Sequence, residues 1–166
     1  IRFVPGNHPP RDQYSKRGNR QVQKEYLALV HGTLASSSGT VKLPIGRHPV
    51  DRKRMSTVSS RGRKAHTQWT IKDQFQWFTL LTVMLETGRT HQVRVHCASI
   101  GHALLGDPVY GRTPAELRKI LKDLGFERQA LHAASLGFEH PVTGKWLEFG
   151  SKLPEDMQEL IDQTTR

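Results

Sequence analysis

The chain has 166 residues, enough for one domain with a sizeable core and too few for two. Its formal net charge of +10 and its pI near 10.2 indicate a polyanionic partner. Nucleic acid ranks ahead of a membrane surface, because no basic amphipathic helix is found. A single cysteine excludes an internal disulfide, and neither a signal peptide nor a membrane-spanning apolar run is found, so we expect a cytoplasmic or organelle-matrix location.

Residues 1–20 are polar and basic with little apolar periodicity. This pattern predicts a flexible basic arm ahead of a domain over residues 21–166. The apolar run 26–30 ends at a glycine and predicts a buried strand, and a Ser/Gly-rich turn over 36–39 leads to a second strand over 41–45.

Residues 47–64 form a basic stretch with little to bury, which predicts a long surface loop or a loose hairpin. One acid, Asp51, faces seven basic side chains: Arg47, Arg52, Lys53, Arg54, Arg61, Arg63 and Lys64. A solvated loop is the simplest interpretation. We favour a loop that contacts phosphates, because so one-sided a charge suits a polyanion.

The second half of the sequence mixes strands and helices. Strands are expected over 65–71 and 77–85, around a turn at 72–74, and the second is apolar on both faces, as in the centre of a covered sheet. A helix is expected after Thr90 as its N-cap, and another at Thr113, with Pro114 as first helical residue and Glu116 completing a capping box, to about residue 122.

The chain is expected to close with a hairpin of strands over 131–139 and 145–150 and a helix over 154–162. Without regular βαβ units, the predicted class is α+β: a mixed, mainly antiparallel sheet with flanking helices.

The densest group of chemically active side chains lies at the strand-to-helix junction 88–96. It contains Arg89, His91, Arg94 and His96. A helix N-terminus attracts anions, and Arg89 at its start is suited to bind a carboxylate or phosphate bidentately. His91 and Arg94 are further candidates for substrate contacts.

Other site chemistries fit this junction poorly. A metal site is disfavoured because histidines five residues apart do not share a helix face and no second Cys/His cluster completes four ligands. A Ser-His-Asp hydrolase, a phosphate loop and a DNA-binding regulator each lack their motif.

Six segments, in order over residues 22–160, resemble the RluA-type RNA pseudouridine synthases. They are KEYLALVHG at 24–32, PIGR with DRKRM at 44–47 and 51–55, KAHT at 64–67, GRTHQVRVH with GH and GDPVYG at 88–96, 101–102 and 106–111, LHAASLGFEHP at 131–141, and LPEDM at 153–157. The resemblance implies a pseudouridine-synthase-like core and isomerisation of uridine to pseudouridine in ribosomal or transfer RNA, without cofactor or metal.

The resemblance also implies roles for three residues. Tyr26 matches the tyrosine that packs on the target base and is placed for proton transfer, although its position also suits a core tyrosine. Arg89 matches the arginine that pairs with the catalytic aspartate and lowers its pKa. Leu131 matches an apolar residue of the uracil pocket, and plain core is an equally good interpretation.

One element of the family pattern is absent from the sequence. The family's nucleophilic aspartate lies in a His-Arg-Leu-Asp stretch upstream of the tyrosine, and the only upstream aspartate here, Asp12, has a different context. Asp107 belongs to a Gly-Asp-Pro motif that suits a turn or a cap. We therefore expect either an N-terminally truncated catalytic domain, with the aspartate on a missing segment or a partner chain, or a non-catalytic RNA-binding relative.

The first alternative is favoured because Tyr26 and Arg89 both persist. For the chain alone, we expect RNA binding with little or no turnover. Arg89 without its carboxylate would also attract an anion such as sulfate or phosphate.

Overall fold

The computed structural model describes residues 2–3, 15–17, 20–59 and 61–165. Its strands are β1 (Arg2–Phe3), β2 (Ser15–Arg17), β3 (Arg20–His31), β4 (Ser38–Val41), β5 (Gly46–Arg47), β6 (Met55–Ser56), β7 (Thr67–Gln74), β8 (Phe78–Leu85), β9 (Leu131–Glu139) and β10 (Trp146–Gly150). Its helices are α1 (Gln92–Ser99), α2 (Ala115–Asp123) and α3 (Glu155–Thr164).

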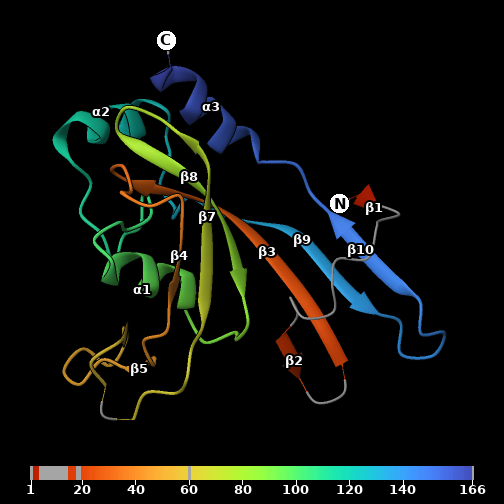
Figure 1. The fold of residues 1–166 in the computed structure, drawn as a ribbon. Helices are drawn as coiled ribbons and strands as arrows, with labels where there is room; N and C mark the ends of the chain where they lie inside the picture. Colours follow the sequence, from red (N-terminus) through yellow and green to blue (C-terminus); the bar gives the residue numbers. More distant parts are fainter. Residues whose placement is uncertain (1, 4–14, 18–19, 60, 166) are drawn as a thin grey trace.

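One large sheet organises the molecule (Figure 1). Its strands follow the order β1-β10-β9-β3-β8-β7-β4, β2 pairs with β3, and β5 and β6 form a separate small hairpin. Every strand pair in the described part of the chain is antiparallel. The expected α+β class with a mainly antiparallel sheet is confirmed.

The central strands β3 and β8 are buried on both faces, because their alternating side chains enter two different cores. On one face, Leu29 and Leu80 pack with side chains of α2 and α3, such as Leu117 and Met157. The opposite core contains Ala28, Val30, Leu81 and Val83 of these strands together with Val93 and Cys97 of α1. The expected central, covered position of the 77–85 strand is confirmed.

Several predicted boundaries were wrong. The helix after Arg89 starts at Gln92, and its N-cap is His91, not Thr90. The next helix starts at Ala115 with Pro114 as N-cap and no side-chain capping bond, so the capping box of Thr113 and Glu116 does not form. Backbone geometry decided both cases, since a hydroxyl caps a helix only when its own residue holds the N-cap position.

Two strand boundaries also differ from the prediction. The Ser/Gly-rich segment expected as a turn contributes to β4, which ends at Val41, while Ile45 makes an isolated bridge with Arg63. The expected turn at 72–74 continues β7, with a register shift between Ile71 and Asp73. A bulge of this kind inserts one extra residue into a strand, and the pairing continues beyond it.

Most of the arm predicted over residues 1–20 lies outside the described residues. Within it, Arg2–Phe3 pairs with β10 and Ser15–Arg17 pairs with β3. Among the described helices, none has the length and apolar character needed to cross a membrane.

Candidate functional site

A pocket of about 340 Å³, here called the inner pocket, opens where β3, β9 and the start of α1 meet. It brings together five residues singled out from the sequence: Tyr26, Arg89, His91, Arg94 and Leu131. Its other lining residues are Lys24, Leu85, Gly88, Gln92, Val93 and Gln129. None of these eleven lining residues carries a carboxylate, and a uracil-sized ring fits the volume and the mixture of apolar and polar walls.

Tyr26 and Leu131 form the apolar side of the inner pocket. Tyr26 lies opposite Val83 of β8 and Ala133 of β9, and a register shift in the β3–β9 pairing separates it from Glu25. Bulges next to active sites re-aim side chains. Both Tyr26 and Leu131 are partly buried against the core that includes α1, so each contributes to the core and to the pocket wall.

Arg89 lies at the border between the inner pocket and a second, larger cleft. Its Nε donates a hydrogen bond of 2.8 Å to the carbonyl of Lys64, which fixes the plane of the guanidinium. Arg89 and the preceding Gly88 line both cavities. An anion in the inner pocket and a phosphate in the cleft would therefore both lie close to this one side chain.

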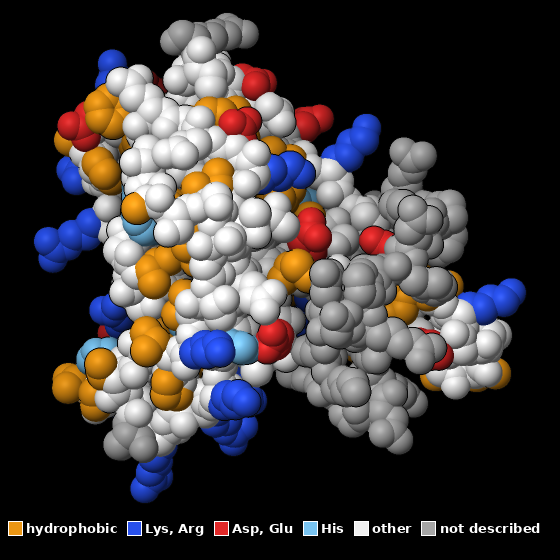
Figure 2. Space-filling model, in the orientation of Figure 1, with side chains coloured by type: hydrophobic (Ala, Val, Ile, Leu, Met, Phe, Trp, Pro, Cys, Tyr) orange, Lys and Arg blue, Asp and Glu red, His pale blue; other side chains and the backbone are white. Residues whose placement is uncertain are grey.

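The larger cavity, here called the basic cleft, has a volume of about 630 Å³. Five arginines line it: Arg47, Arg52, Arg61, Arg63 and Arg89. The remaining lining residues, Ile45, Gly46, Pro49, Met55, Ser59, Gly88 and Thr90, include no acid. Figure 2 shows Lys and Arg side chains close together at the end of the molecule that carries β5. Unopposed guanidinium groups in one cleft suit a polyanion.

The other predicted basic contacts are placed differently. Lys53 and Lys64 are exposed but do not line the basic cleft. Arg54 is half-buried and lies with its guanidinium carbon 5.4 Å from the ring centre of Tyr110. The sequence grouped seven basic residues in one loop, and the structure brings four of them into the cleft with Arg89. The expectation of a loose hairpin is confirmed by the β5–β6 pair.

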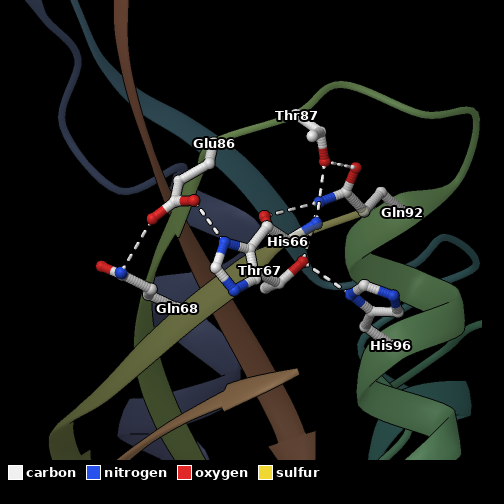
Figure 3. A network of polar contacts seen from close by, with 7 residues as sticks. All are labelled: His66, Thr67, Gln68, Glu86, Thr87, Gln92 and His96. Carbon is white, nitrogen blue, oxygen red and sulfur yellow. Dashed lines mark hydrogen bonds and ion pairs between the residues drawn. The ribbon is translucent and has the colours of Figure 1, made fainter. Parts of the chain in front are cut away.

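A buried amide holds the turn that presents Arg89 (Figure 3). Gln92 Nε2 donates to the His66 carbonyl and to Thr67 Oγ1, each at 2.9 Å. Its Oε1 accepts from the Thr87 hydroxyl at 2.7 Å and from the Arg89 backbone N–H at 3.0 Å. All four hydrogen-bonding positions of the amide are used, which rigidifies the junction between β8 and α1.

The two histidines of the junction have separate partners. His96 is fully buried on α1, where Thr67 Oγ1 donates to its Nδ1 at 2.7 Å (Figure 3). His96 Nε2 donates to the Leu43 carbonyl at 2.7 Å. His91 Nδ1 accepts from the Tyr110 hydroxyl at 2.7 Å. In the part of the chain that the structure describes, no group of three or more potential metal ligands is found.

His91 adopts a left-handed backbone conformation with φ of 56°. This is uncommon for a residue with a side chain and is concentrated at functional sites. Burial, and next the nearby Arg94, hold the pKa of His91 below its ordinary value despite the opposing effect of Asp107. The ring is therefore neutral near pH 7, which lets Nδ1 accept a hydrogen bond.

Arg94 lines the inner pocket, but its guanidinium is paired inside the protein. Its Nε and Nη2 donate to the Asp107 carboxylate at 2.9 and 3.0 Å. Asp107 Oδ1 also accepts the backbone N–H groups of Val109 and Tyr110, so the expected turn-capping role of Asp107 is confirmed. Burial alone would raise the pKa of Asp107, and these hydrogen bonds outweigh it and leave the pKa below its ordinary value.

The sequence analysis missed three structural roles in this region. They are the hydrogen-bond network of Gln92, the contacts of Tyr110 and the pairing of Asp107 with Arg94. The GDPVYG segment that contains Asp107 and Tyr110 follows the junction by about a dozen residues. A single sequence does not reveal which distant side chain pairs with a buried arginine. The pairing of Arg94 with Asp107 could therefore not be predicted from the sequence.

Comparison with known proteins assigns the chain to a family. The family model for RNA pseudouridylate synthases matches residues 11–99. An uncharacterized RNA pseudouridine synthase of Bacillus subtilis is 48% identical over 144 residues, which cover 87% of this chain and 45% of that protein. A ribosomal large subunit pseudouridine synthase D of Zymomonas mobilis is 47% identical over 144 residues, with 86% of this chain and 45% of that protein covered.

Solved structures agree with the sequence relatives. Human RNA pseudouridylate synthase domain containing 1 superposes with a TM-score of 0.65 at 26% identity, covering 87% of this chain and 66% of that one. Human RNA pseudouridylate synthase domain containing 4 gives 0.68 at 25% identity, covering 87% and 62%. The chain spans less than half the length of the two bacterial relatives. The resemblance to RluA-type enzymes is confirmed, and the chain belongs to the RNA pseudouridylate synthase family.

Proposed function

We propose that the chain is part of an enzyme that isomerises uridine to pseudouridine in ribosomal RNA. The observation that carries the proposal is that two cavities of different chemistry share Gly88 and Arg89 in their walls. The inner pocket suits a single base, and the basic cleft suits the phosphates on either side of it. Ribosomal RNA is preferred over transfer RNA because the relative from Zymomonas mobilis is named a ribosomal large subunit pseudouridine synthase.

The reaction requires the base to leave its stack and enter the inner pocket. There the bond between N1 and the ribose C1′ breaks, the uracil turns, and a bond from C5 to C1′ forms. The C5 proton leaves and N1 gains a proton, so the atoms balance. Tyr26 packs on the ring and is placed for the proton transfer, and Leu131 limits the space in which the ring turns.

The carboxylate that attacks the nucleotide comes from outside the residues that line the inner pocket. None of those residues is Asp or Glu, and Asp107 is committed to Arg94 and to its own turn. We propose that a segment beyond this sequence, or a partner chain, supplies it beside Arg89. The guanidinium would then lower the pKa of that carboxyl and keep it ionised.

The lack of a carboxylate among the lining residues of the inner pocket also supports a second candidate, a non-catalytic RNA-binding relative. In that case the basic cleft still binds RNA, but no carboxylate meets Arg89. Both candidates predict RNA affinity that falls steeply with salt, because each neutralised phosphate releases a counterion. The two candidates differ only in whether the bound uridine is converted to pseudouridine.

The test is to express the complete reading frame that contains this sequence and incubate it with unmodified ribosomal RNA. Pseudouridine is then mapped by carbodiimide modification and primer extension. We expect new stops at one or a few uridines, and a rate at least about a hundredfold lower for Arg89→Ala, since a charge-stabilising donor is removed from the site.

Arg118→Ala is the matched control for the Arg89 substitution. Arg118 is exposed on α2, and its Nη2 donates to the Thr113 carbonyl, away from both cavities. The Arg118→Ala variant should form pseudouridine at the same rate as the unsubstituted protein. RNA binding without any pseudouridine would favour the non-catalytic relative, and a preference for duplex DNA would refute both candidates.

A further inference from the structure

The β5–β6 hairpin forms part of the wall of the basic cleft and lies outside the main sheet. It carries Arg47, Arg52 and Arg54, and its two strands pair with each other. His48 N–H donates to the Arg54 carbonyl at 2.8 Å, and Arg54 N–H donates to the Asp51 carbonyl at 3.1 Å. These bonds hold the hairpin together, and contacts with α1 set its position: shortly before the hairpin, the Leu43 carbonyl accepts a hydrogen bond of 2.7 Å from His96 Nε2 of α1.

Tyr110 supplies a contact between this unit and α1. Its hydroxyl accepts the backbone N–H of Met55 at 2.9 Å and donates to His91 Nδ1 at 2.7 Å. Met55 of β6 and Tyr110 are partly buried against a small core of Ile45, Ala65 and Val95, and Val95 belongs to α1. One oxygen therefore links the hairpin backbone to the N-cap of α1.

The ring of Tyr110 is itself fixed from the α1 side. The backbone N–H of Tyr110 donates to Asp107 Oδ1 at 3.1 Å, and the guanidinium carbon of Arg94 lies 5.0 Å from the ring centre. Arg54 of the hairpin lies 5.4 Å from the same ring centre, so cation–π contacts reach the ring from both elements. Arg54 Nε is buried without a described hydrogen-bond partner, which leaves the aromatic ring as a main contact for this side chain.

We propose that Tyr110 is a positioning residue that fixes the β5–β6 hairpin to the N-terminal turn of α1. It thereby sets the distance between the inner pocket and the two arginines that the hairpin contributes to the basic cleft, Arg47 and Arg52. We call this connection between the hairpin and α1 the Tyr110 latch. The latch is a property of the fold, and its effect on RNA binding rests on the proposed function. Tyr110 lines neither cavity, so its effect is exerted through Met55, Arg54 and His91.

Limited trypsin digestion of this chain tests the latch, because trypsin cleaves after Arg52, Lys53 and Arg54 in the hairpin. Lys119 and Lys122 of α2 provide internal reference sites. In Tyr110→Phe, which keeps the ring and removes the hydroxyl, we expect hairpin cleavage to accelerate about tenfold relative to the α2 sites, since two hydrogen bonds are lost. Fragments are assigned by mass spectrometry.

Thr79→Val is the control for a general loss of stability. Thr79 is buried on β8, and its hydroxyl donates one hydrogen bond of 2.7 Å to the Gly32 carbonyl, far from the hairpin in the fold. Its ratio of hairpin to α2 cleavage should match that of the unsubstituted chain. An unchanged ratio in Tyr110→Phe, or cleavage that rises equally at hairpin and α2, overturns the proposal.

A second readout separates the latch from the proposed function. For Tyr110→Phe we expect weaker binding to a ribosomal RNA fragment and a shallower dependence of affinity on salt, because fewer arginines are held at the phosphates. Faster hairpin cleavage with no RNA binding by the unsubstituted chain would uphold the latch and refute the RNA-binding role.

Discussion

At the scale of single residues, the described part of the chain contains two Arg–Asp pairs with the same bidentate geometry in different surroundings. Arg94 and Asp107 have side chains only 9% and 0% exposed, whereas Arg128 and Asp156 are 40% and 46% exposed. Donor–acceptor distances are 2.9–3.0 Å in the first pair and 2.9 Å in the second. The two pairs therefore have the same geometry and differ in how deeply they are buried.

Asp107→Asn should destabilise the fold by about 3–5 kcal/mol, because it leaves the buried Arg94 cation without its counter-charge. The corresponding change at the surface, Asp156→Asn, should cost less than about 1 kcal/mol. Urea denaturation followed by tryptophan fluorescence measures both. Equal losses in the two variants would show that burial does not set the importance of the Arg94–Asp107 pair.

At the scale of elements, the junction between β8 and α1 depends on one amide. Gln92 is 2% exposed, and its four hydrogen bonds reach β7, the residues after β8 and the Arg89 backbone. The positive φ of His91 adds strain at the same junction. The turn is therefore maintained by the network rather than by the local backbone preference.

Gln92→Glu should loosen this junction. The new oxygen faces the His66 carbonyl and cannot donate to it, so a buried charge and an unsatisfied carbonyl together cost about 2–4 kcal/mol. Hydrogen exchange should accelerate over residues 86–92 more than over β3. Gln158→Glu on the exposed face of α3, where the amide donates to Asp162, is the matched control and should leave exchange at the junction unchanged. Equal protection at the junction in both variants would contradict this role of Gln92.

The same elements show what the sequence predicted and what it did not. The apolar run at β8 and the turn residues of the β9–β10 hairpin are local signals, and they predicted those elements within a few residues. The apolar run over 26–30 predicted only the buried end of β3, which begins at Arg20 in a polar stretch. The grouping of Tyr26, Arg89 and Leu131 followed only from the family resemblance. Local patterns do not encode which strand lies beside which, so the inner pocket was not derivable from spacing.

The role of the basic loop was predicted in outline and not in detail. Charge alone indicated a phosphate-binding surface, and four of its arginines do line the basic cleft. The stacking of Arg54 on Tyr110 depends on the path of residues 106–111, more than fifty positions later in the chain. Long-range packing of this kind leaves no periodic trace in a single sequence.

At the scale of the whole molecule, the buried His96 and the half-buried His31 and His91 make stability depend on pH. Burial is the first cause that lowers the pKa of His31, His91 and His96 below the ordinary value of 6.5. The unfolded chain therefore binds more protons than the folded one below about pH 6.5, and stability falls as the pH drops through that value toward the folded pKa values. Asp107 and Asp156, with lowered pKa values, add a second loss below their ordinary value of 3.8.

We therefore expect the free energy of unfolding to be constant from pH 8 to about 7 and to decrease between pH 6.5 and 5. Chemical denaturation at each pH measures it. His96→Gln removes one of the three imidazoles and should flatten the decrease between pH 6.5 and 5. Stability that stays constant over this range in the unsubstituted chain would contradict the account of buried, neutral histidines.

Tritium release from RNA labelled at uridine C5 tests the central claim most directly, because the C5 proton leaves only when the uracil is rejoined through carbon. The assay compares this chain, at high concentration, with the complete reading frame on the same RNA. The account predicts release by the complete protein and background counts for the chain alone, with salt-sensitive RNA binding in both. Release by the chain alone at a comparable rate would mean that one of its own carboxylates is the nucleophile, and would contradict the proposal that the carboxylate beside Arg89 comes from elsewhere.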